Sequence, residues 1–131
     1  MAKKLVRVTL VGDAKEEYLK LKEMVEDEHK QKVVSSFHQT LLRSIDSKIA
    51  ILKEQCDYGT QIPKSQVPAK YLAYDVTNLW KIDLSGYWRM IYTLRQPQRE
   101  SAEIEIMEII LDVLDIVDHP DYDKIFGYRK R

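Results

Sequence analysis

The chain of 131 residues is 44% hydrophobic and 32% charged, and its 21 basic and 21 acidic residues cancel to a net charge of zero. This length allows a single domain, residues 1–131, with a buried core, and no apolar stretch approaches the roughly 18 residues of a membrane span. Cys56 is the only cysteine, which excludes an intramolecular disulfide and a cysteine-rich zinc site. The apolar part of the basic N-terminus is interrupted by Arg7 and Thr9, unlike that of a signal peptide, so we expect a cytoplasmic protein.

The first quarter of the sequence predicts a strand and a helix. Residues 5–11 alternate between apolar and polar side chains, which is typical of a half-buried strand. Gly12 ends this strand, and Asp13 followed by Glu16 is typical of a capping box at the start of a helix. One face of that helix carries Ala14, Tyr18, Leu21 and Val25.

A second helix follows a polar turn at residues 26–32. Its apolar side chains recur every three or four residues, which is the strongest periodic signal in the chain. They are Val34, Phe37, Leu41, Ile45, Ile49, Leu52 and Cys56. We expect the two helices to form an antiparallel pair that is closed by residues 57–59. His38 lies within the second helix, where we expect it beside the core rather than as a metal ligand.

Residues 60–77 contain Pro63 and Pro68 and predict an extended loop. This loop leads into residues 78–92, where two runs rich in aromatic and β-branched side chains flank a Ser-Gly pair. Such runs around a turn signal are typical of a β-hairpin.

The register of this hairpin decides which side chains share a face. A two-residue turn at residues 85–86 is chemically favourable, because glycine supplies a positive φ, but it mixes apolar and charged side chains on both faces. A three-residue loop at residues 85–87 instead pairs Trp80 with Tyr92, Ile82 with Met90 and Leu84 with Trp88. We prefer this loop, because it gives one apolar face and gathers Lys81, Asp83 and Arg89 on the other.

The C-terminal third predicts a strand and a short helix. Residues 96–101 form a polar turn, and residues 102–117 are rich in isoleucine and valine, as in a long central strand. Residues 109–117 also fit a helix, with apolar side chains on one side and aspartates opposite. After a turn at residues 118–120, the tail predicts a short helix that ends at Gly127.

The predicted order is therefore β-α-α-β-β-β followed by a short helix. Two antiparallel helices packed on one face of a small, mainly antiparallel sheet make an α+β fold. The opposite face, which we expect to be concave, would carry Lys81 and Arg89. A lysine and an arginine held side by side on a sheet and backed by two tryptophans suit the binding of a phosphate.

Charge is distributed in blocks although the chain is neutral. Residues 58–95 carry five basic and two acidic residues, a net charge of +3. Residues 101–123 carry eight acidic and no basic residues, and the last eight residues carry a net charge of +4. Such blocks allow a basic groove beside an acidic flank, and the alternative is an ordinary solvated charged surface.

His119 lies just beyond the last predicted strand, where its side chain could project over the sheet face. An imidazole can take or give a proton near neutral pH, as attack by a 2′-hydroxyl or departure of a 5′-oxygen requires. Arg89 and Lys81 could stabilise the charge that builds on the phosphoryl oxygens. These groups would be enough for cleavage of RNA by its own 2′-hydroxyl without a metal. The alternative is that residues 118–120 only begin a helix.

No nucleotide-binding loop, nucleophile elbow or metalloprotease motif is present in the sequence. The three histidines, at positions 29, 38 and 119, lie far apart. We therefore expect no metal, no cofactor and no small-molecule ligand.

Taken together, these segments resemble the RelE/ParE superfamily of toxins from bacterial and archaeal toxin–antitoxin pairs, and within it the RelE-like ribonuclease branch. The resemblance is carried by residues 78–84, Asn-Leu-Trp-Lys-Ile-Asp-Leu, and by residues 86–92, Gly-Tyr-Trp-Arg-Met-Ile-Tyr. It continues in residues 119–129, with their histidine, tyrosine and Phe-Gly-Tyr-Arg. The order of elements agrees over nearly all of residues 5–129.

The resemblance implies a RelE-like fold and a small endoribonuclease, an mRNA interferase that acts on free RNA or on the ribosome and is neutralised by an antitoxin protein. It implies that Arg89 binds the phosphate and that Lys81 is the basic residue of the first hairpin strand. Proton transfer or stacking would fall to His119, Tyr122 or Tyr128. The further RNA-binding residues would be Lys64, Lys70 and Arg129.

Two other functions compete with this hypothesis. One is a catalytically inactive RelE-fold module that binds RNA or protein, which is favoured by the neutral charge and by Asp83, since active relatives tend to carry a second basic residue there. The other is ParE-like inhibition of a topoisomerase, which would leave His119 without an evident role. In each case we expect a protein partner to approach the basic side of the sheet.

Overall fold

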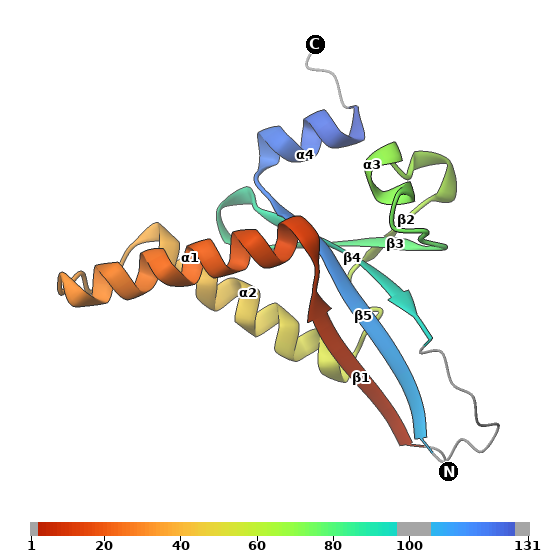
Figure 1. Ribbon diagram of the computed structural model, residues 1–131, viewed down its shortest axis with the longest axis horizontal. Coiled ribbons are helices and arrows are strands. Elements are labelled where there is room, and N and C mark those ends of the chain that lie inside the picture. Colours follow the sequence, from red (N-terminus) through yellow and green to blue (C-terminus); the bar gives the residue numbers. More distant parts are fainter. Residues whose placement is uncertain (1–2, 97–105, 128–131) are drawn as a thin grey trace.

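The computed structural model describes residues 3–96 and 106–127, which form one five-stranded sheet with helices on both faces (Figure 1). The strands are β1 (Lys3–Leu10), β2 (Thr60–Ile62), β3 (Leu79–Asp83), β4 (Arg89–Arg95) and β5 (Ile106–Val117). They lie in the order β1-β5-β4-β3-β2, in which β1 and β5 are parallel and the other neighbouring pairs are antiparallel.

The α-helices are α1 (Gly12–Lys30), α2 (Phe37–Glu54), α3 (Ala69–Leu72) and α4 (His119–Phe126). Two short 3-10 helices are η1 (Lys64–Gln66) and η2 (Ser85–Tyr87). This is an α+β fold with a mixed sheet, which confirms the predicted fold class. None of the helices in the described part of the chain is long and apolar enough to cross a membrane.

α1 begins without the predicted capping box. Its N-cap is Val11, and no side chain caps it. Gly12, at φ +50°, turns the chain directly from β1 into the helix, a conformation that glycine adopts without steric cost. Asp13 therefore lies inside the first turn instead of at the cap, and its predicted pairing with Glu16 does not form.

α2 begins three residues later than the hydrophobic pattern predicts. Ser36 is its N-cap and accepts a hydrogen bond from Gln39 N at 3.1 Å, and Val34, predicted to lie in the helix, is 92% exposed. Glu28 of α1 accepts a hydrogen bond from Ser36 and lies 2.9 Å from Nδ1 of His38. These two contacts lower the pKa of Glu28 and hold the turn between the helices.

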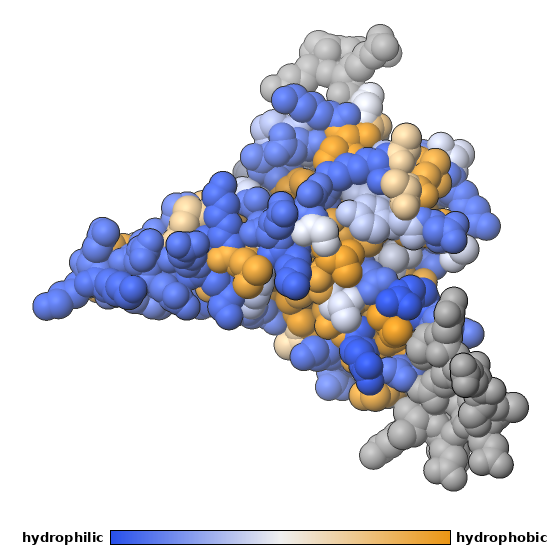
Figure 2. Space-filling model, viewed as in Figure 1, coloured by the Kyte–Doolittle hydropathy of each residue, from blue (hydrophilic) through white to orange (hydrophobic). Residues whose placement is uncertain are grey.

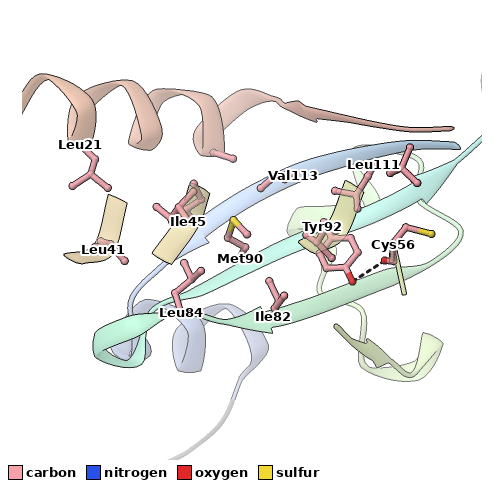
Figure 3. Close-up of a cluster of buried hydrophobic side chains, with 14 residues drawn as sticks. Leu21, Leu41, Ile45, Cys56, Ile82, Leu84, Met90, Tyr92, Leu111 and Val113 are labelled. Atoms are coloured by element: carbon pink, nitrogen blue, oxygen red, sulfur yellow. Dashed lines mark hydrogen bonds between the residues drawn. The ribbon is translucent and has the colours of Figure 1, made fainter. Parts of the chain in front are cut away.

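The main buried cluster lies between the α1–α2 pair and one face of the sheet (Figure 3). Its helical side chains include Leu21, Leu41, Ile45 and Leu52, and its sheet side chains include Ile82, Leu84, Met90, Tyr92, Leu111 and Val113. α2 ends at Glu54, so Cys56 lies just beyond the helix, where its thiol is buried and free. The outer end of α1 is hydrophilic, whereas apolar surface gathers where the helix passes over the sheet (Figure 2).

Tyr92 is fully buried in this cluster but keeps two polar contacts. Its hydroxyl donates to the Cys56 carbonyl at 3.1 Å and accepts from Gly59 N at 3.0 Å. Burial raises the pKa of Tyr92 to about 12 from 10.0. A raised tyrosine pKa contributes stability that is complete below pH 10 and is lost as the pH rises through about 12.

We therefore expect Tyr92→Phe to lower the free energy of unfolding by about 1–3 kcal/mol, because the buried Cys56 carbonyl and the partly buried Gly59 N–H lose their partner. The variant should also lose less stability than the wild type between pH 10 and 12. Urea unfolding across this pH range measures both effects. Tyr58→Phe is the control, since Tyr58 is 47% exposed. Equal stability of Tyr92→Phe and wild type would show that these hydrogen bonds contribute nothing.

Residues 60–77 do not form the predicted extended loop. They contain β2, η1 and α3, and Tyr71 of α3 is fully buried. A second cluster lies here, on the sheet face opposite α1 and α2. Its members are Ile62, Tyr71, Leu79, Ile91, Leu114, Val117 and Tyr122. The face predicted to carry Lys81 and Arg89 is therefore partly covered by α3 and α4, because apolar side chains on both helices bury against it.

Residues 106–117 form a strand throughout, so the helical alternative for 109–117 is wrong. β5 pairs with β1 on one edge and with β4 on the other, which satisfies its backbone in the middle of the sheet. A β-bulge interrupts the β4–β5 register, because Ile91 pairs with Asp115 whereas Tyr92 pairs with Val113. The bulge brings Leu114 and Asp115 to the face covered by α3, as such an inserted residue re-aims its neighbours.

The β3–β4 hairpin has the predicted register. Trp80 pairs with Tyr92, Ile82 with Met90, and Leu84 N donates to the Trp88 carbonyl at 2.8 Å across the three-residue loop η2. The apolar face packs on α2. The other face carries Lys81 and Arg89 toward α4.

Candidate functional site

Arg89 and Lys81 meet over one aromatic ring. Arg89 opens β4 and Lys81 lies in β3, and the hairpin register puts both side chains on the face that α4 covers. The guanidinium carbon of Arg89 lies 4.2 Å from the centroid of the Tyr122 ring, and Nζ of Lys81 lies 5.5 Å from it. Tyr122 is 2% exposed, so its ring is a fixed support under both cations.

Asp83 pairs with Arg89 across the hairpin. Nε of Arg89 lies 3.2 Å from Oδ1 of Asp83, and the two residues are direct cross-strand neighbours. The Asp83 side chain is 82% exposed, so solvent screens this pair. Within the described residues, nothing hydrogen-bonds to the two terminal amino groups of Arg89. Those groups have the fork geometry that contacts two oxygens of a phosphate.

The start of α4 is built by a side-chain cap. Asp118 is the N-cap and accepts a hydrogen bond from Asp121 N at 2.9 Å, and the helix ends at Gly127 at φ +73°, as predicted. His119 is the first residue of this helix and its side chain is half exposed. Residues 118–120 thus begin a helix and also place an accessible imidazole.

His119 lies at the same end of the sheet as Arg89. Arg89 pairs with Val117, the last residue of β5, and His119 follows two residues later. Nε2 of His119 lies 3.4 Å from Oδ2 of Asp123, one turn along α4. The centroid of its ring is 6.5 Å from that of Tyr87. A group able to transfer protons therefore lies at the same end of the sheet as Arg89, on the helix that carries Tyr122.

This arrangement can hold a phosphate group and exchange a proton with a hydroxyl next to it. Two cations supported by a buried ring supply preorganised positive charge. An imidazole within ion-pair distance of a carboxylate is held in one orientation. Tyr122 contributes to this site as the ring on which Arg89 rests, because its side chain is buried and does not face solvent.

Lys64 and Lys70, both predicted to bind RNA, have different surroundings. Lys64 lies on the exposed η1, and no ion pair to it occurs among the described residues. Nζ of Lys70 lies 2.5 Å from Oδ2 of Asp115 and 3.2 Å from Oδ2 of Asp13. Partial burial acts to lower the pKa of Lys70, but Asp115 and Asp13 outweigh it and raise that pKa. The contacts of Lys70 are structural, and its binding to RNA stays a prediction. Tyr128 and Arg129 lie outside the described residues.

We expect Lys70→Met to lower the free energy of unfolding by about 1–3 kcal/mol. The change leaves Asp115, which is 3% exposed, with the Tyr71 hydroxyl at 3.1 Å but without its counter-ion. The loss stays below that of a fully buried pair, because the Lys70 side chain is 37% exposed. Lys64→Met is the matched control and should change stability by less than about 0.5 kcal/mol. Equal urea midpoints for the two variants would contradict the structural role of Lys70.

One residue of this site, Asp123, was not expected from the sequence. The spacing of His119 and Asp123, four residues apart in a predicted helix, could have indicated their contact. Tyr87 was expected beside the face that carries Lys81 and Arg89, but its contact with the His119 ring depends on the conformation of the hairpin loop and could not be predicted.

Comparison of the chain with known proteins finds no matching family model, curated protein or solved structure. The RelE/ParE assignment therefore rests on the residues quoted above and is a proposal. Within the described residues, no three His, Cys, Asp or Glu side chains gather in a way that could hold a metal ion.

Proposed function

We propose that this protein is a RelE-type endoribonuclease, a cytoplasmic toxin that cleaves mRNA without a metal and is neutralised by an antitoxin protein. The observation that carries the proposal is the pair of cations, Arg89 and Lys81, over the Tyr122 ring, with His119 at the start of the same helix. A cation pair alone would support only anion binding. The neighbouring imidazole adds the proton transfer that cleavage requires.

In the proposed reaction, the terminal amino groups of Arg89 bind the non-bridging oxygens of the scissile phosphate, and Lys81 adds a second positive charge. His119 takes the proton of the 2′-hydroxyl as that oxygen attacks phosphorus, and Asp123 orients the imidazole. The bond between phosphorus and the 5′-oxygen breaks, and the 5′-oxygen takes a proton from solvent. The products are a 2′,3′-cyclic phosphate and a 5′-hydroxyl.

One observation favours a second candidate, the catalytically inactive module that binds RNA or protein. Asp83 occupies Nε of Arg89 at 3.2 Å, and a carboxylate at this position repels a phosphate. The exposure of Asp83 limits this effect, because the repulsion is screened by solvent and salt. The proposed antitoxin could use acidic groups in the same way to occupy Arg89 and exclude RNA.

Removal of the Asp83 charge tests whether Arg89 binds RNA and whether the protein cleaves it. Purified wild type and Asp83→Asn are incubated with an end-labelled RNA in the presence of a chelator, and cleavage and binding are measured. We expect Asp83→Asn to bind RNA several-fold more tightly and to cleave it faster, with a steeper loss of binding as salt rises. Asp27→Asn, at an exposed side chain of α1, is the charge-matched control. If wild type and Asp83→Asn both bind RNA without cleaving it, the inactive module is favoured. If the two proteins bind RNA equally, Arg89 does not contact the RNA.

A further inference from the structure

Tyr87 is the most exposed aromatic side chain in the described part of the chain, at 81%. Its backbone has φ +64°, a conformation that bulky residues rarely adopt and that occurs with strain. Glycine or asparagine would fit this position more easily. A tyrosine at this position therefore strains the backbone, and burial of its ring does not offset that strain.

The loop that presents Tyr87 is held in place by α2. The backbone N–H of Ser85 donates to Oγ of Ser44 at 3.1 Å. Gly86, at φ +71°, packs so closely on Phe37 that an added Cβ would lie 2.4 Å from the Phe37 ring. Tyr87 thus projects from a fixed backbone, which reduces the entropy lost when its ring binds a ligand.

The Tyr87 ring stands at the edge of the candidate site. It is 6.5 Å from the His119 ring, at an interplanar angle of 53°, so the two rings are neighbours and not stacked face to face. Arg89 follows Tyr87 by two residues and lies over α4, the helix that His119 begins. An exposed aromatic ring therefore lies beside His119, at the end of the hairpin where β4 begins with Arg89.

We propose that Tyr87 is a nucleobase subsite, on which a base next to the phosphate held by Arg89 stacks. This inference rests on the proposed function and adds to it the part of the substrate that the cations do not contact. Base–aromatic stacking is tolerant of sequence, because every base has a π-face. The subsite would therefore position the RNA chain for attack on its phosphate without selecting one base.

The experiment uses the full-length protein and two uncleavable 2′-O-methyl oligonucleotides of equal length, one with 2-aminopurine at its centre and one abasic there. Stacking quenches 2-aminopurine fluorescence. We expect the wild type and Tyr87→Phe to quench it, and to bind this oligonucleotide about tenfold more tightly than the abasic one. Tyr87→Asn should lose both effects yet bind the abasic oligonucleotide like the wild type, since its phosphate contacts remain.

Stability separates this role from a structural one. Because asparagine accepts a positive φ, Tyr87→Asn should unfold at a urea concentration equal to or higher than that of the wild type. Tyr74→Asn, at an exposed tyrosine beside Gly12, is the control and should not change quenching. Equal wild-type affinity for the two oligonucleotides would overturn the subsite and leave phosphate binding intact. A wild type that binds neither would refute the RNA-binding proposal itself, and with it the subsite.

Discussion

Arg89→Ala should reduce RNA cleavage by about 10²–10³-fold, equivalent to about 3–4 kcal/mol of transition-state stabilisation, because it removes a preorganised donor at the phosphoryl oxygens. Arg89→Lys should recover only part of the rate, since an ammonium can neither stack on Tyr122 as a planar group nor contact two oxygens in a fork. Single-turnover cleavage of a labelled RNA measures the loss, and circular dichroism shows whether the fold is kept.

Arg95→Ala is a matched control at the far end of the same strand. Arg95 pairs with Asp112 at 2.6 Å, away from Tyr122, so its loss should affect stability but leave cleavage within about threefold of the wild type. Full activity of Arg89→Ala would remove Arg89 from the reaction. Equal loss of activity in both variants would show that the effect comes from weakened folding.

His119→Gln should reduce cleavage by about 10²–10⁴-fold, because general acid–base catalysis contributes factors of this size. RNA affinity should stay within about threefold of the wild type, since the binding cations remain. Cleavage rates and fluorescence anisotropy on an uncleavable analogue separate the two quantities. His38→Gln is the matched control: its imidazole contacts Glu28 in the helical turn, and its replacement should not change the rate.

The His119 variant also tests the alternative reading of residues 118–120 as a helix start. Asp118 supplies the side-chain cap of α4, so replacement of His119 should leave the helix in place. Unfolding of His119→Gln would show that this residue is structural. If the folded variant cleaves RNA at the wild-type rate, a residue other than His119 transfers the proton.

The hairpin and the last helix could be predicted from sequence, because local rules decide both. Sorting apolar from charged side chains fixed the three-residue loop, and a turn begun by Pro120 with a C-terminal glycine delimited α4. The β2–α3 segment could not be predicted in this way. Its helix has four residues, and it forms because Tyr71 and its neighbours pack against β5, which lies far away in the sequence.

The candidate site likewise has a part that local sequence rules predict and a part that depends on tertiary contacts. Strand parity placed Lys81 and Arg89 on one face, as the structure has them. Their common support, Tyr122, depends on how α4 folds back over the sheet, which is a tertiary contact. The partner of Lys70 depends on a β-bulge that turns Asp115 toward α3, and no local pattern indicates that bulge.

The central claim is that this protein cleaves RNA through Arg89 and leaves a 5′-hydroxyl. The most direct measurement maps 5′-hydroxyl RNA ends in cells that express the wild type or Arg89→Ala to equal levels, which detects cleavage of free RNA and of RNA on ribosomes alike. We expect new 5′-hydroxyl ends in mRNA with the wild type and none above background with the variant. Intact mRNA in cells that contain folded wild-type protein, or the same ends with Arg89→Ala, would contradict it.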